Sequence, residues 1–334
     1  MKLVLFSDIH FGLSSNDETH NQNCLKFLEF VQEWCDENLN DDFTTIFLGD
    51  WYHQRNAINV KTMNYSKEGL ITLSNIGVKQ YMLVGNHDMF YKDRRDIHSI
   101  IIPEDASGIE IIDEPIMFQN MLLCPWLTED ENLKDLISQY NPEYVFGHFE
   151  LPSFPLNSMT IFPGEFNPMD YEGVKRICSG HFHQRSSKSN INYIGNCFSH
   201  NFADSNNWMN KGFCVLDTET NEMQCIEWND APKFSMMRMS KLSTLNIANN
   251  MSLKIINDIN LKPLDLNNLR DELIKMGHFR DVFFVPVESD SLFVDNKECL
   301  ENIADINTFI ISLLSDIDTK DIDNNTLIKI YSEL

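Results

Sequence analysis

Residues 81–88 read Tyr-Met-Leu-Val-Gly-Asn-His-Asp, an apolar run that stops at a glycine and leads into three polar side chains. A short run of this kind predicts a buried strand. Asn86 offers a neutral carbonyl oxygen as a ligand, and His87 can hydrogen-bond to an oxygen of a substrate. This is the most specific single motif of the chain, and it predicts a site at the end of a strand.

Similar segments follow other apolar runs in the first 200 residues. These runs are residues 3–6, 45–48, 144–146 and 176–178. With Asn86, the segments behind them carry seven metal-ligand side chains, which are Asp8, His10, Asp50, Asn86, His148, His181 and His183. Helical spacing over 23–38 and 62–75 predicts strand–helix alternation and a largely parallel sheet, whose strand ends would gather these residues. Strands expected at 192–194, 212–216 and 223–228 would form a second sheet that completes a sandwich.

The ligand set is hard to borderline in character, which suits two divalent ions such as Mn²⁺. Two ions ~3.5–4 Å apart repel each other unless an anionic ligand is shared, and the carboxylate of Asp50 has two oxygens for that role. Alone, Asp50 could equally be a helix N-cap, and a single histidine is more often structural. The ordered series of segments at strand ends favours a two-metal phosphoesterase over these separate explanations.

The composition of the chain narrows the class of protein to which it can belong. The chain has 334 residues, with 43% hydrophobic and 23% charged content, which is typical of a globular protein with one large and one smaller domain. We find no apolar run that approaches a membrane span and no signal sequence at the amino terminus, so we expect a cytoplasmic protein. The richness in Asn and Asp favours an AT-rich source such as a phage, and so the cytoplasm of a bacterium or a phage-infected host. The eight cysteines form no CxxC pair, which predicts reduced thiols and no zinc–thiolate site.

The formal net charge of −24 argues against broad, unaided binding to nucleic acid, because phosphate contacts need lysine and arginine. Bound divalent ions or a basic partner subunit would offset this charge. Local basic groups occur at 92–95 and 185–188, although each single residue there could be a solvated loop charge.

The motifs DxH, GD, GNHD, GH and GHxH, matched over roughly residues 1–200, resemble those of the calcineurin-like metallophosphoesterases. That resemblance implies a four-layer α-β-β-α sandwich with two metal ions. One ion would be held by Asp8, His10, Asp50 and His183, and the other by Asp50, Asn86, His148 and His181. His87 would stabilise or protonate the leaving oxygen, and Asp88 would orient His87.

Within that superfamily the chain looks most like the DNA-repair nuclease branch of SbcD and meiotic recombination protein eleven, including its tailed-phage members. The DxHxG start at 8–12, His53 three residues after Asp50, and Tyr-Ile-Gly at 193–195 favour this branch. Asn196 departs from the branch, which often has Ser or Thr at that position. Gln184 also departs from it, because a Pro is frequent there. His53 could also be an exposed loop residue.

The resemblance implies a Mn²⁺-dependent exonuclease and endonuclease subunit for DNA repair and recombination. Its parts would be a nuclease domain at 1–230, a small α+β cap at 231–290 that helps hold DNA, and a helical tail at 291–334. The tail would bind the coiled coils of an SbcC or Rad-fifty-type ATPase, and the nuclease would be a homodimer. Residues 291–334 carry nine acidic and three basic residues on two amphipathic helical patterns, which must dock on the body or on a partner.

Two alternatives stay open. A phosphatase or small-molecule phosphodiesterase of the same superfamily is favoured by the charge of −24. A non-catalytic scaffold would keep a vestigial metal site and recruit an ATPase partner through its last forty residues. The intact His87 argues against the scaffold.

Overall fold

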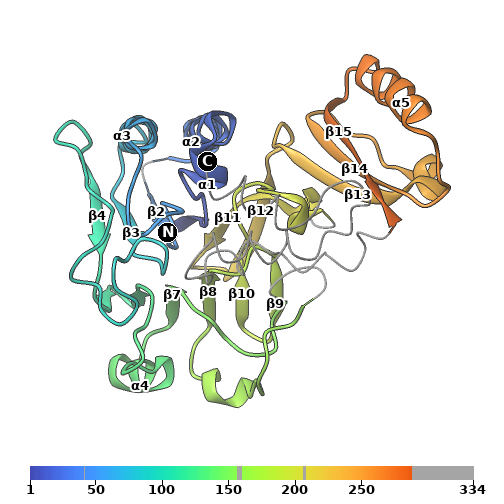
Figure 1. The fold of residues 1–334 in the computed structure, drawn as a ribbon. Coiled ribbons are helices and arrows are strands. Elements are labelled where there is room, and N and C mark those ends of the chain that lie inside the picture. Colours follow the sequence, from blue (N-terminus) through green and yellow to red (C-terminus); the bar gives the residue numbers. More distant parts are fainter. Residues whose placement is uncertain (41, 156–159, 206–207, 288–334) are drawn as a thin grey trace, which may run out of the picture.

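The computed structural model describes residues 1–334 except 41, 156–159, 206–207 and 288–334. The strands of the described part form two mixed six-stranded sheets and a three-stranded sheet (Figure 1). In spatial order, the first sheet contains β12 (Glu222–Glu227), β11 (Gly212–Asp217), β1 (Lys2–Phe6), β2 (Phe43–Phe47), β3 (Gln80–Leu83) and β4 (Ile109–Ile112). The second contains β5 (Ile116–Phe118), β6 (Met121–Cys124), β7 (Tyr144–His148), β8 (Arg176–Gly180), β10 (Ile191–Tyr193) and β9 (Ser186–Lys188).

The strands that carry the ligand motifs are divided between the two sheets. β1, β2 and β3 are parallel neighbours in the first sheet, whereas β7 and β8 are parallel neighbours in the second. The prediction that the strands after His183 make up the second sheet is wrong for two of them. β11 pairs antiparallel with the open edge of β1, and β12 follows it, so both extend the first sheet. The second sheet already begins at β5.

Apolar clusters on both faces of each sheet explain this layering. Between the sheets, Leu5 and Leu48 of the first pack in one cluster with Leu123 and Phe146 of the second. Helices α2 (Glu18–Asn38) and α3 (Val60–Ser74) cover the outer face of the first sheet, and α4 (Leu133–Tyr140) lies on the other side of the molecule against the second (Figure 1). The central strands are therefore buried on both sides, which fits their nearly continuous apolar sequences.

The two long helices begin earlier than their apolar spacing indicates. Asp17 accepts a hydrogen bond from the backbone N–H of His20 and caps α2 at Glu18, and Asn59 caps α3 in the same way. Shorter helical segments are α1 (Leu13–Asn16) and the 3₁₀ helices η1 (Pro168–Tyr171), η2 (Phe202–Asp204), η3 (Trp208–Asn210) and η4 (Met239–Thr244). No helix in the described part is long and apolar enough to cross a membrane.

A small parallel sheet follows the two large ones. It contains β13 (Lys233–Arg238), β14 (Met251–Asn257) and β15 (Phe279–Pro286), with α5 (Pro263–Lys275) packed on it. These elements lie within residues 231–290, which were expected to form a small α+β cap. The ring of Phe202 in η2 contacts Phe234 and Phe283, which joins this sheet to the large domain. The predicted helical tail at 291–334 lies outside the described residues.

The expectation of reduced cysteines is wrong for one pair. Cys214 and Cys225 face each other across β11 and β12, with their Cα atoms 4.0 Å apart, and form a disulfide. Among the described cysteines, the five others are buried free thiols. No local pattern predicts this pair, because its geometry depends on the register between two strands.

Candidate metal centre

All seven predicted ligand residues lie at the ends of strands where the two sheets face each other. Asp8 and His10 follow β1, Asp50 follows β2, and Asn86 follows β3. From the second sheet, His148 ends β7, and the segment 181–183 follows β8. The carboxyl ends of parallel strands lie on the same edge of a sheet, so two such edges bring these side chains to one place.

The backbone of these loops is held in a conformation that few residues adopt. Asp8, His10, Asp50 and His181 all have positive φ, between 53° and 85°. Such positions cost about 1–3 kcal/mol each and concentrate at functional sites. Backbone hydrogen bonds tie the first two loops together, since His10 donates to the carbonyl oxygen of Asp50 at 3.2 Å. Gly49 is also required here, because a Cβ atom would lie 2.5 Å from Nδ1 of His148.

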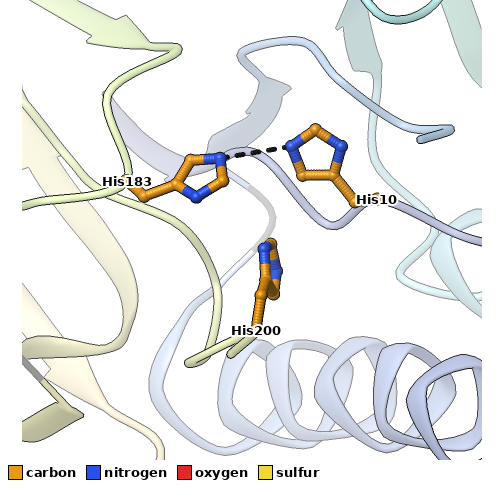
Figure 2. A group of neighbouring side chains, drawn as sticks. All are labelled: His10, His183 and His200. Carbon is orange, nitrogen blue, oxygen red and sulfur yellow. Dashed lines mark hydrogen bonds between the residues drawn. The ribbon is translucent and has the colours of Figure 1, made fainter. Parts of the chain in front are cut away.

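The first half of the centre, as we call it, consists of Asp8, His10, Asp50 and His183. Nε2 of His10 lies 3.3 Å from Nε2 of His183, 3.7 Å from Oδ2 of Asp50 and 3.9 Å from Oδ1 of Asp8. Nε2 of His183 is 3.8 Å from the same Asp8 oxygen. Figure 2 shows the His10 and His183 rings directed at each other across this gap. Two carboxylates and two imidazoles thus converge on one point.

The second half consists of Asp50, Asn86, His148 and His181. Nε2 of His148 lies 3.3 Å from Oδ2 of Asp50 and 3.0 Å from Oδ1 of Asn86. Nδ1 of His181 lies 3.2 Å from the same amide oxygen. Oδ2 of Asp50 is therefore close to an imidazole of each half, which is the position of a shared ligand.

The electrostatics of the centre fit bound cations. Burial lowers the pKa of His10 well below its usual value, so this ring is neutral and keeps a lone pair. Burial would raise the pKa of Asp50, but His148 and His87 hold it well below its usual value, so the carboxylate is charged. Burial would also lower the pKa of His148, yet the Asp50 carboxylate raises it to about 9. The proton on His148 thus places a positive charge where a bound divalent ion would place one. The carboxylate, amide and imidazole donors of the centre suit two such ions.

His87 and His53 lie beside the first half. The backbone N–H of His87 donates to Oδ1 of Asp50 at 2.9 Å, and Nδ1 of its ring lies 2.7 Å from the carbonyl oxygen of His53. The two rings stack, with centroids 5.3 Å apart and planes 15° from parallel. His53 is half-buried rather than an exposed loop residue, and burial lowers its pKa to about 3.

Asp88 anchors the loop that follows β2. Its buried carboxylate accepts hydrogen bonds from the backbone N–H groups of Asp50, Trp51, Tyr52 and Gly85, at 2.9–3.2 Å. Burial and the Asp50 charge raise its pKa to about 7. The hydrogen-bond partner of the His87 ring is the carbonyl oxygen of His53, and the expected orienting role of Asp88 stays a prediction.

A cavity of about 310 Å³ opens next to the second half. His148, Glu150, Trp126 and Glu131 are among its lining residues. The Trp126 ring lies 4.9 Å from the His181 ring, centroid to centroid. Space for a substrate therefore adjoins the second half.

Comparison with known proteins identifies the family. A family model described as calcineurin-like phosphoesterase matches residues 1–185. The chain belongs to this family. Exonuclease subunit 1 of Enterobacteria phage T4 is 29% identical to it over 236 residues, which cover 69% of this chain and 68% of that protein. The sequence-based assignment of this phosphoesterase to its family, with a phage exonuclease subunit as a relative, is thereby confirmed.

Solved structures resemble the phosphoesterase more distantly. A dimetal phosphatase from Danio rerio has 12% identity and a TM-score of 0.39, covering 64% of this chain and 91% of its own. The calcineurin-like phosphoesterase YfkN from Bacillus subtilis has 11% identity and a TM-score of 0.34, covering 68% of this chain and 88% of its own.

Sequence reasoning missed several residues of this phosphoesterase centre. Oε1 of Glu150 lies 3.4 Å from Nε2 of His181, and its spacing of two after His148 was the only available signal. Lys211 is buried and donates to the carbonyl oxygen of His183 at 2.8 Å. His200 lies against the first half, with its ring centroid 5.3 Å from that of His10. Neither Lys211 nor His200 follows a strand-and-glycine pattern, so nothing in the sequence pointed to them.

Proposed function

We propose that the protein is a Mn²⁺-dependent nuclease subunit that hydrolyses DNA phosphodiester bonds with two metal ions. The observation that carries this proposal is the shared position of Asp50, whose Oδ2 lies 3.7 Å from an imidazole of the first half and 3.3 Å from one of the second. When bound, two divalent ions would polarise the phosphate and provide an activated water as nucleophile. The residues of the first and second halves would hold one ion each and share Asp50.

His87 is the proposed proton donor to the leaving oxygen. Its Nδ1 donates to the carbonyl oxygen of His53 at 2.7 Å, so the proton given to the leaving oxygen would be the one on Nε2 of the doubly protonated ring. The stacked His53 ring and the bond from the His87 backbone to Asp50 hold the imidazole at the centre. General acids placed in this way contribute about 10²–10⁴-fold to a rate.

Two observations support DNA as the substrate. The relative from phage T4 is named as an exonuclease subunit. The small sheet and its connections, residues 233–286, carry eight basic and five acidic residues, although the whole chain has a net charge of −24. We infer that this cap is the part that contacts the DNA backbone, because phosphate contacts need lysine and arginine.

The local basic groups near the motifs give less support. Arg95 is buried and pairs with Glu131 and Glu114, and the Arg185 guanidinium donates to the carbonyl oxygen of Ile194. The guanidinium of Arg95 thus has structural partners, whereas Nη2 of Arg185 is buried and has no hydrogen-bond partner among the described residues.

A nuclease assay tests the proposal. Linear duplex, hairpin and single-stranded DNA are incubated with the protein and Mn²⁺ or Mg²⁺, with and without an ABC ATPase partner. Nucleotide monoesters and cyclic nucleotides serve as competing substrates, since the charge of −24 favours a phosphatase or small-molecule phosphodiesterase as the second candidate. We expect Mn²⁺-dependent DNA cleavage that the small substrates do not suppress. No cleavage of any DNA under any of these conditions would refute the proposal.

We also propose that residues 291–334 form the ATPase-binding segment. Their net charge of −6 and two amphipathic patterns motivate this role, and the word subunit in the name of the T4 relative is consistent with a partner. Truncation after Asp290 should abolish co-purification with the ATPase while both metal ions are still bound. A truncated chain that still forms the complex would refute this assignment.

A further inference from the structure

A third imidazole faces the first half of the centre. His200 is 5% exposed, and its ring centroid lies 5.3 Å from that of His10 and 5.1 Å from that of His183. One ring nitrogen from each of the three histidines lies within 4.8 Å of the others. Figure 2 shows the His200 ring standing below the gap between His10 and His183.

Neither ring nitrogen of His200 has a hydrogen-bond partner among the described residues. A buried polar atom without a partner costs about 1–3 kcal/mol, so native structures rarely leave one unsatisfied. The buried ring therefore needs a partner for its nitrogens, and a metal ion at the first half would supply one.

The backbone around His200 is fixed by the same network that fixes His183. The His200 N–H donates to Oδ2 of Asp204 at 2.9 Å, and the Asn196 side chain donates to the same oxygen. Lys211 lies 3.5 Å from Asp204 and donates to the carbonyl oxygen of His183 at 2.8 Å. The two histidines are thus presented by one buried set of polar groups, and their relative position is built into the fold.

We propose that His200 is a third imidazole ligand of the ion held by the first half, beside His10 and His183. This inference rests on the proposed two-metal centre. Metal–nitrogen bonds of ~2.1 Å place two ligand atoms of one ion at most about 4.2 Å apart, and Nε2 of His10 and Nε2 of His183 are already 3.3 Å apart. The three histidines each have a ring nitrogen within 4.8 Å of the others, so His200 would move toward the ion when it binds. Three imidazoles make this site richer in nitrogen than the second, which favours Mn²⁺ or Zn²⁺ over Mg²⁺.

Calorimetric titration with Mn²⁺ tests the inference on the full chain. We expect wild type to bind two ions, and His200→Ala to weaken one of them by at least ~10-fold while the other keeps its affinity. His278→Ala, which removes an exposed histidine of the cap, is the matched control and should bind as wild type does. Equal affinities of wild type and His200→Ala at both sites would overturn the inference, whereas wild type that binds no ion would refute the proposed centre itself.

A second measurement needs no variant and holds even if His200→Ala fails to fold. Wild type with ¹⁵N-labelled histidine is loaded with ¹¹³Cd²⁺, and the ring nitrogens with a cadmium coupling are counted by NMR. We expect five, from His10, His183 and His200 in the first half and His148 and His181 in the second. Four coupled nitrogens would leave His200 as a packing residue against His10 and would overturn the inference.

Discussion

The two halves of the metal centre differ in what surrounds them. The first is enclosed by imidazoles, since the rings of His53, His87 and His200 all lie 5.0–5.4 Å from His10. The second opens on a cavity of about 310 Å³ beside Trp126 and Glu150. We infer that proton transfer takes place beside the first half and that the substrate enters beside the second. Asp50 belongs to both and should couple them.

Asp50→Asn changes the residue that both halves share and should have the largest effect. Loss of the shared charge weakens the binding of both ions. We therefore expect the rate of hydrolysis to fall by more than ~10⁴-fold, which is the upper limit for the contribution of a single general acid. Metal titration should show two weakened sites. One weakened site with the other intact would show that Asp50 is not shared.

His87→Ala separates proton transfer from metal binding. We expect the rate to fall by ~10²–10⁴-fold, because the proposed proton donor is lost, while two Mn²⁺ ions still bind. Rates come from single-turnover cleavage and ion counts from direct metal analysis of the same sample. Unchanged cleavage would exclude His87 from catalysis.

Glu150→Ala should perturb only the second half. The Glu150 carboxylate accepts from Nε2 of His181 at 3.4 Å and so favours the tautomer whose Nδ1 lone pair faces the centre. We expect about tenfold weaker Mn²⁺ binding at one site, with the first half unchanged. Glu129→Ala removes an exposed carboxylate from the same cavity and is the control. Equal losses in both variants would indicate a general charge effect.

The smallest expected effect is on folding stability at low pH, through Glu131 in the wall of the cavity. Burial would raise the pKa of Glu131, but its hydrogen bond from Arg95 lowers the pKa below the usual value. As the pH falls, Glu131 is therefore protonated in the unfolded chain before it is protonated in the folded protein. The stabilisation that its ionised carboxylate gives above about pH 4.5 is lost as the pH falls through the lower folded pKa. Denaturant unfolding from pH 6 to pH 3 should show a shallower loss for Glu131→Gln than for wild type. Glu129→Gln should follow wild type, and parallel curves for all three proteins would contradict this account.

The sequence indicated the ligand residues because a buried strand that stops at a glycine is a local pattern. Asp8, Asp50 and Asn86 could be placed at strand ends without knowing which sheet each strand joins. The pairing of β11 with β1 could not be predicted, because apolar strands reveal burial but not their neighbours. Glu150 and His200 could not be predicted as site residues for a similar reason, because their roles depend on contacts with residues that are distant along the chain.

The most direct test of the two-metal account is the rate of hydrolysis of an end-labelled linear duplex, measured against the number of Mn²⁺ ions added per chain. The protein is stripped of metal, held well above its Mn²⁺ dissociation constants and assayed with its ATPase partner present. If two ions act together, the rate should rise with added Mn²⁺ and level off at two ions per chain. A rate that levels off at one ion per chain, or no hydrolysis at any ratio, would contradict it.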